Sequence, residues 1–484
     1  MGKSIKKNYL YNILLNISKV IFPLITAPYV SRVLEPDGVG LFNFSHSYAG
    51  YFTLIAMLGI PIYGTREVSK VKDDKKALTN LVSQIMSISI ISTFIISLIY
   101  ICTIILIGQL TENYLIFLIA GFSIYLVPFS INWYYQGLEE FSFITLRTII
   151  IKTLSVICLF LFVKQKNDLI IYVILNVSGT VIADIWNFFK MKKTGIQPYF
   201  TYKDIRQHIK PLFTLFASSI AISIYTILDT LMLGFIKDYV EVGYYSTAMH
   251  MSKSVLTVVT SLSLVAIPRI SYYMKNNEYD KINDLINKSF SIITFLSVPA
   301  AIGLACISCV FVPLFFGQQF VGAIVPLMIL SMLIIIIGLN NLTGTQILVA
   351  MGFDNLFLYS VLAGTLSNLF MNCVFIPLWG AIGASIASII AEILVLFVTV
   401  FYVNKNTNIR IQNKMDFLKA LIGSLTFIPL VFCLHKYIDG WFLVGTFVIV
   451  GVCVYFVVEL FLKNKSVNLF YSVIKNKIKN KKDI

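Results

Sequence analysis

Long apolar runs separated by short polar segments repeat along the whole chain. A helix of roughly 20 residues crosses the core of a bilayer, and only helices or closed barrels satisfy their backbone polar groups in lipid. The runs are too long for barrel strands, so the pattern predicts an all-α polytopic membrane protein with about 14 transmembrane helices. The expected spans are residues 10–32, 40–62, 80–107, 114–136, 144–163, 169–190, 211–236, 243–268, 289–315, 320–350, 356–377, 381–403, 417–435 and 441–462.

The spans form two blocks of six with two further helices. The expected organisation is an N-terminal six-helix lobe (1–190), a cytoplasmic loop (191–210), a second six-helix lobe (211–403), two additional helices (404–462) and a basic tail (463–484). Similar glycine patterns follow the first and the seventh spans. Because six is an even number, both blocks enter the membrane in the same sense, and such a parallel repeat is typical of transporters.

Composition and charge support a membrane protein with a defined orientation. Of the residues, 58% are hydrophobic and only 13% are charged, which excludes an ordinary soluble domain. Thirty of the 38 Lys and Arg residues fall in alternate polar segments, so the positive-inside rule predicts that both termini are cytoplasmic. The net charge of +15 therefore belongs to inner loops that contact anionic membrane lipids, and no nucleic-acid partner is expected.

The seven cysteines all lie in expected spans, so no disulfide framework is predicted. Cys306 and Cys309 form a C-x-x-C inside an apolar helix with no second pair, which favours small packing residues over a metal or redox site. We expect no metal, no cofactor and no catalytic residue.

Polar residues recur at helical spacing in four spans that occupy matching places in the two blocks. They are Asn12, Asn16, Lys19, Pro23 and Thr26 in the first span; Asn43, His46, Ser47, Gly50 and Thr53 in the second; Ser219, Ser223, Thr226 and Asp229 in the seventh; and Ser246, His250, Lys253, Thr257 and Thr260 in the eighth. These stripes predict a water-filled cavity between the lobes. The alternative is that each stripe is a face on which helices pack through small polar side chains.

Five residues are candidates for substrate binding. Lys19 and Lys253 fall near the middle of the membrane, one in each block, and a cationic cavity favours an anionic headgroup such as a phosphate or pyrophosphate. His46 lies on the stripe of the second span. Arg32 and Arg66 could guide the headgroup at the outer and inner mouths, or could be ordinary interfacial arginines.

Further charged residues in the spans are candidates for ion coupling or for structural pairs. Asp229 and His250 are expected near the outer face on adjacent helices, as a proton or cation site or as a hydrogen-bonded packing pair. Glu392 lies in the middle of the twelfth span and could couple transport to an ion or be buried in its protonated form. Lys152 and Asp184 lie at similar depths, which favours a structural ion pair.

The chain resembles a family of polysaccharide transporters, the Wzx-type flippases of the multidrug/oligosaccharidyl-lipid/polysaccharide superfamily. The residues that carry the resemblance are Tyr29-Val30-Ser31-Arg32-Val33-Leu34-Glu35-Pro36-Asp37-Gly38-Val39-Gly40, Leu58-Gly59-Ile60-Pro61, Thr65-Arg66-Glu67, Asp229-Thr230-Leu231-Met232-Leu233-Gly234, Val242-Gly243-Tyr244-Tyr245-Ser246-Thr247-Ala248, Ile267-Pro268-Arg269-Ile270-Ser271 and Gly380-Ala381-Ile382-Gly383-Ala384. These are loose patterns of glycine, proline and charge that extend over nearly the whole chain.

The resemblance implies two six-helix lobes around a cationic cavity. It further implies alternating-access transport of an undecaprenyl-pyrophosphate-linked oligosaccharide from the inner to the outer leaflet of the bacterial cytoplasmic (inner) membrane, for O-antigen, capsule or exopolysaccharide. Lys19, Arg32 and Lys253 would bind the headgroup. A polysaccharide polymerase is a candidate partner, and H⁺ or Na⁺ is a candidate coupling ion. The alternatives are a multidrug exporter of the same superfamily, a peptidoglycan-precursor flippase, and a membrane polymerase or glycosyltransferase that uses lipid-linked sugars.

Overall fold

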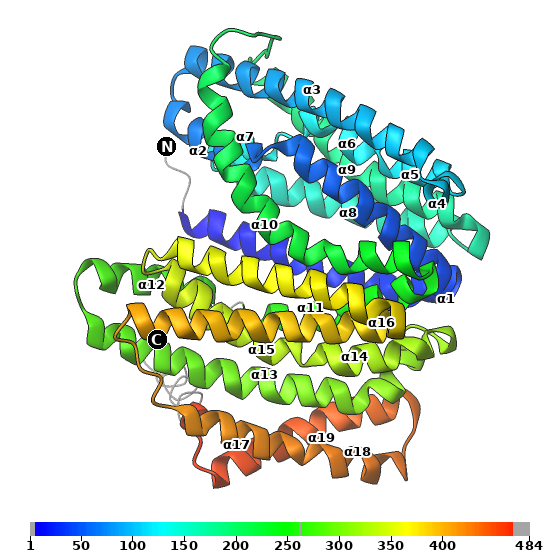
Figure 1. Cartoon of the computed structure of the whole chain (residues 1–484), viewed down its shortest axis with the longest axis vertical. Coiled ribbons are helices and arrows are strands. Elements are labelled where there is room, and N and C mark those ends of the chain that lie inside the picture. The colour runs from blue at the N-terminus through cyan, green and yellow to red at the C-terminus, as the bar shows by residue number, and fades with distance from the viewer. Residues whose placement is uncertain (1–4, 261–262, 468–484) are drawn as a thin grey trace, which may run out of the picture. The chain divides into compact units, whose positions relative to one another are not determined.

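Helices form nearly all of the described chain (Figure 1). The computed structural model describes residues 5–260 and 263–467, with side chains throughout this range except at residues 5–10, 12–13, 16, 19–20, 217–226 and 263–265. No strand occurs within these ranges. The chain divides into two compact units, Met1–Gly243 and Tyr244–Ile484. The all-α class is confirmed for the described residues.

The first unit is built from helices of very different lengths. They are α1 (Ile5–Met57), α2 (Ile60–Val71), α3 (Lys75–Leu106), α4 (Gly108–Thr111), α5 (Tyr114–Ala120), α6 (Phe122–Tyr125), the 3₁₀ turn η1 (Val127–Phe129), α7 (Asn132–Gly137), α8 (Phe141–Phe162), the 3₁₀ turn η2 (Lys166–Asp168), α9 (Leu169–Lys193) and α10 (Arg206–Ile236).

The second unit contains the remaining helices. They are α11 (Tyr239–Thr260, whose first residues belong to the first unit), α12 (Ser263–Lys275), α13 (Tyr279–Phe315), the 3₁₀ segment η3 (Gln318–Ala323), α14 (Ile324–Ser331), α15 (Leu333–Asn340), the π-helical segment η4 (Asn341–Val349), α16 (Asp354–Asn406), α17 (Lys414–Leu425), α18 (Phe427–His435) and α19 (Gly440–Phe461).

Eight helices in the described ranges are long and apolar enough to cross a membrane. Other expected spans appear as merged or broken helices. The first two expected spans are the two arms of α1, which bends where Glu35 leaves the helical region (φ 59°, ψ 174°). The eleventh and twelfth are the arms of α16, which bends at Gly380 (φ 55°, ψ −127°). The expected span 114–136 is instead divided among α5, α6, η1 and α7.

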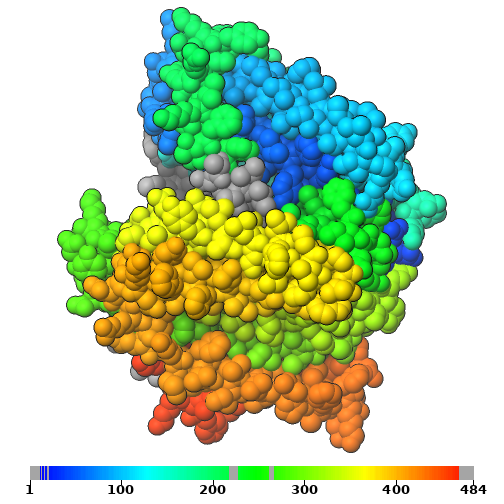
Figure 2. Space-filling model, in the orientation of Figure 1, coloured from blue at the N-terminus to red at the C-terminus, as the bar shows by residue number. Residues whose placement is uncertain are grey.

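The surfaces of these helices carry large apolar side chains. Phe94 and Leu106 of α3 are exposed, as are Phe442 and Phe461 at the two ends of α19, whose surface is orange to red in Figure 2. In water such exposure would be costly, whereas lipid tails solvate these side chains well. The exposed apolar surface therefore agrees with a protein that lies in a bilayer.

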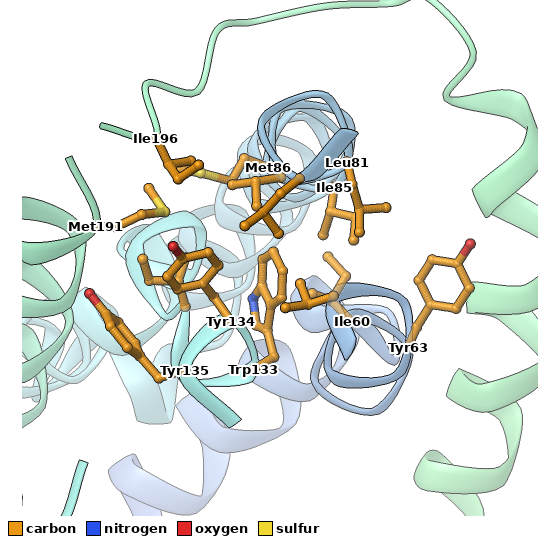
Figure 3. Packing of buried hydrophobic residues seen from close by; sticks show 14 of the residues in the cluster. Ile60, Tyr63, Leu81, Ile85, Met86, Trp133, Tyr134, Tyr135, Met191 and Ile196 are labelled. Atoms are coloured by element: carbon orange, nitrogen blue, oxygen red, sulfur yellow. The ribbon is translucent and has the colours of Figure 1, made fainter. Parts of the chain in front are cut away.

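The best-defined core of the first unit lies where α2, α3 and α7 meet (Figure 3). Trp133 and Tyr134 of α7 pack against Ile60 of α2 and Met86 of α3, all of them buried. At Gly64 of α2 the helix passes so close to the indole of Trp133 that a side chain has no room. This cluster holds the amphipathic helix α2 in place after the turn at Leu58 and Gly59, both of which have positive φ.

Helix α10 is attached to the same unit through a buried histidine. Tyr63 Oη lies 2.6 Å from His208 Nδ1, and His208 Nε2 lies 2.9 Å from Gln84 Oε1. A neutral imidazole with its proton on Nε2 satisfies both contacts, because Nδ1 then accepts and Nε2 donates. Burial lowers the pKa of His208, and the carboxylate of Glu67 opposes this shift.

The last three helices pack against α13 through a buried polar cluster at one end of the second unit. Ser291 Oγ donates to Asp416 Oδ2 at 2.6 Å, and Ser466 Oγ donates to the Ser291 carbonyl at 2.8 Å. Asn464 donates to the buried carboxylate of Glu459. Because buried polar groups are costly unless they are paired, these bonds fix α17 and α19 to α13 in one arrangement.

Candidate functional site

A cavity of about 360 Å³ lies within the first unit, among α1, α8 and α9. Its lining combines three charged side chains with amides and hydroxyls: Arg147, Lys152, Asp184, Asn132, Asn176, Ser130, Ser155, Thr26, Thr148 and Thr180. Phe22 and Tyr172 add aromatic surface. We call this space the N-unit cavity. Polar side chains are expensive inside a membrane-spanning bundle, and they commonly mark the path of a polar substrate or ion.

Polar residues at helical spacing form two walls of the N-unit cavity. On α9, Asn176, Thr180 and Asp184 follow one another at steps of four residues and therefore share one face of the helix. On α8, Arg147 and Lys152 turn toward the same space. The remaining faces of both helices are apolar and largely exposed, as expected next to lipid.

Arg147 is the most deeply buried cation of the cavity, with 5% of its surface exposed. Its Nη1 donates to the Ala183 carbonyl at 3.2 Å and to the side-chain oxygen of Asn187, and its Nη2 donates to Asn132 Oδ1 at 3.3 Å. These acceptors are all neutral. Within the described chain the buried Nε–H of Arg147 finds no hydrogen-bond acceptor.

The other two charged groups of the cavity are those for which the sequence favours a structural ion pair. Lys152 and Asp184 both line the N-unit cavity, and the Lys152 ammonium lies 5.7 Å from the centre of the Phe22 ring. Asp184 also interacts electrostatically with Arg147. The direct Lys152–Asp184 ion pair stays a prediction, and both side chains line the N-unit cavity.

Four of the candidate substrate-binding residues belong to the first unit, and the structure describes the side chains of three of them. The side chain of Lys19 lies outside the described residues. Arg32 is exposed, and His46 is also exposed, with its ring stacked on Phe42 at 5.7 Å. Arg66 lies on α2, where it donates to Glu67 at 3.0 Å and covers the ring of Tyr63. The roles of these residues in binding stay predictions.

The candidate coupling residues fall in both units. Asp229 is buried on α10 in the first unit. In the second unit, His250 and Lys253 are exposed one turn apart on α11, and Glu392 is buried on α16. Asn340 donates from its Nδ2 to the carboxylate of Glu392, just before the π-helical segment η4. π-helical turns are frequent at functional sites. The contact between Asn340 and Glu392 lies beside such a turn, and the role of Glu392 in ion coupling stays a prediction.

Neither metal clusters nor disulfides occur in the described parts of the chain. No group of three or more His, Cys, Asp or Glu side chains is arranged there to hold a metal ion, and all seven cysteines are unpaired.

A model of one protein family matches residues 5–274, which is more than half of the 484-residue chain. The description of that family is polysaccharide biosynthesis protein. The chain belongs to this family. The resemblance seen in the sequence is thereby confirmed at the level of the family.

Two relatives match over most of their own length. The "Putative O-antigen transporter" of Escherichia coli (strain K12) is 24% identical over 411 residues, which cover 83% of this chain and 97% of the relative. The protein of the same name from Shigella dysenteriae is 21% identical and covers 81% of this chain and 98% of the relative.

The fold is also found among solved structures. The inward closed conformation of the lipid II flippase MurJ superposes with a TM-score of 0.76 at 19% identity, covering 94% of this chain and 99% of that protein. An inward-facing multidrug resistance MATE family transporter of the MOP superfamily gives a TM-score of 0.59 at 15% identity, covering 84% and 96%. These similarities show that the fold is one shared by transporters.

Sequence reasoning missed Asn132 and Asn187 and counted Arg147, near the start of the expected span 144–163, among the thirty basic residues of the inner segments. The structure instead buries Arg147 and Asn187 and joins them to the half-buried Asn132 in one hydrogen-bonded group beside the N-unit cavity. One signal was present in the sequence, because the polar stripe of Asn176, Thr180 and Asp184 in an apolar segment is as regular as the stripes of the first and second spans.

Proposed function

We propose that this protein is a flippase that moves a lipid-linked oligosaccharide across the membrane. The observation that carries the proposal is the match to the E. coli O-antigen transporter over 97% of that protein, with family membership and a transporter fold in support. The N-unit cavity adds a physical reason, because a space of about 360 Å³ that carries charged, amide and hydroxyl side chains among lipid-facing helices suits a polar cargo. The protein acts as a transporter and not as an enzyme.

In the full proposal, the carrier lipid is undecaprenyl pyrophosphate and the membrane is the bacterial cytoplasmic (inner) membrane, with both termini in the cytoplasm. Lys19, Arg32 and Lys253 attract the pyrophosphate, while His46 and Arg66 line its route. The distribution of basic residues supports this orientation, because the positive-inside rule places the lysine-rich segments in the cytoplasm.

The energy for transport can come from the membrane potential and from an ion. Moving a dianion outward from a negative interior is favourable by about 2.3 kcal/mol per charge for each 100 mV. Asp229, His250 and Glu392 are the groups proposed to couple transport to H⁺ or Na⁺. A polysaccharide polymerase that receives the glycan at the outer leaflet is the proposed partner.

Cells that lack their own O-antigen transporter test the function. Expression of this protein should restore glycan at the cell surface, and the Lys19→Ala/Lys253→Ala variant should restore less than the wild type. Lys164→Ala, which removes an exposed charge in the loop before η2, is the matched control and should behave as wild type. A protein that reaches the membrane at normal levels and restores no surface glycan, with several different repeat units, would contradict the proposal.

A further inference from the structure

We propose that the N-unit cavity is a subsite for one acidic sugar of the cargo, a sugar that carries a single carboxylate. This inference rests on the proposed function and names a chemical class within it. It assigns the charged groups of the cavity, Arg147, Lys152 and Asp184, to recognition of the glycan and not of the lipid headgroup.

The net positive charge of the cavity lining favours binding of an anion. Two cations and one carboxylate line the cavity, which leaves one positive charge in excess. The net charge of +1 is the same whether Asp184 compensates Arg147 or Lys152. The groups that accept hydrogen bonds from Arg147, on Asn187, Ala183, Asn132 and Thr148, are all neutral, so these bonds leave its charge uncompensated. A carboxylate entering the cavity would balance this excess charge.

The same charges argue against the pyrophosphate headgroup as the occupant. One positive charge in excess balances one carboxylate, whereas a dianion would leave an uncompensated negative charge next to Asp184. The volume points the same way. At about 360 Å³ the cavity is near the lower end of the range for small-molecule pockets, so it holds a small part of a glycan and not a whole lipid-linked oligosaccharide.

The neutral lining suits a sugar ring. Asn176 Oδ1 offers an acceptor, Asn132 Nδ2 offers a donor and Ser155 offers a hydroxyl, which together match the hydroxyls of a sugar. Phe22 and Tyr172 supply aromatic surface for the apolar C–H faces of the ring. A site built for a bare inorganic ion would need neither the amides nor the aromatic rings.

Two lipid-linked glycans that differ at one position test the subsite in proteoliposomes. They would share a polyprenyl pyrophosphate and differ only in whether the sugar at one position carries a C6 carboxylate or a C6 hydroxymethyl group. Lys152→Gln should lower the ratio of acidic to neutral transfer by about tenfold, the effect expected for one charged hydrogen bond. Asp184→Asn should raise the ratio, while Lys164→Gln, outside the cavity, should leave it unchanged. A ratio that stays within twofold of wild type in both cavity variants would overturn the proposal.

A binding experiment decides the subsite independently of transport. Saturation-transfer NMR on the wild-type protein in nanodiscs should detect methyl glucuronide and not methyl glucoside, and Lys152→Gln should weaken the glucuronide signal. If the wild type transfers neither lipid-linked glycan, the proposed function is contradicted, and this experiment still decides the subsite. Displacement of methyl glucuronide by lower concentrations of inorganic pyrophosphate would assign the cavity to the headgroup and overturn the inference.

Discussion

Gly64→Ala is expected to destabilise the packing of α2 against α7. A methyl group at Gly64 would lie 2.5 Å from Cε3 and 2.7 Å from Cδ2 of Trp133, which is far inside normal contact distance. The indole cannot yield easily, because Trp133 is buried in the cluster with Ile60 and Met86 (Figure 3). Overpacking of a core costs about 1–3 kcal/mol, and alanine recovers up to about 1 kcal/mol through its better helix propensity.

The net loss should therefore be roughly 0–3 kcal/mol, which lowers the melting temperature of a unit of this size by up to roughly 12 °C. The assay is the loss of the monodisperse peak in size-exclusion chromatography after heating in detergent. Gly50→Ala is the matched control, because a methyl group there meets nothing within 4 Å, and it should melt at or slightly above the wild-type temperature. A Gly64→Ala protein that melts no lower than Gly50→Ala would refute the packing argument.

Three further changes probe other parts of the fold. Arg147→Leu should lower the melting temperature more than Gly64→Ala does, because it leaves the buried amide of Asn187 without its donor; equal melting of Arg147→Leu and wild type would show that the network contributes little. Burial lowers the pKa of His208, so the unfolded state binds more protons and stability should be full above the ordinary pKa of 6.5 and fall at lower pH. Hydrogen exchange of residues 206–216, corrected for intrinsic rates, should accelerate below about pH 6, and the acceleration should vanish in His208→Gln. Gly380→Ala should cost about 1–3 kcal/mol, because φ 55° and ψ −127° are open essentially to glycine alone, and an unchanged melting curve would contradict this.

The helical class and the approximate positions of the spans could be predicted from the sequence, because the length of an apolar run is set by the thickness of a bilayer. The breaks within spans could not. The bend at Gly380 depends on a backbone conformation that hydropathy does not record, and the expected span at 114–136 is divided into several short elements.

The candidate site was only partly predictable for a similar reason. Polar stripes within one helix follow from spacing, and the cavity between the lobes that they predict stays a prediction. The network of Arg147 depends on Asn132 and Asn187, which lie 15 and 40 residues away in sequence and meet only in the folded unit. The positive-inside rule also assigns any arginine near the end of a span to the nearest loop, which is why the burial of Arg147 was not foreseen.

The measurement that tests the central claim most directly is the leaflet distribution of a labelled lipid-linked oligosaccharide in liposomes that contain the purified protein. An impermeant enzyme or lectin added outside reports the fraction of glycan that has crossed, and protein-free liposomes give the background. We predict transfer well above background that increases when an imposed potential favours movement of the anionic headgroup. Transfer equal to background with several glycans, with and without a potential and ion gradients, would contradict the account.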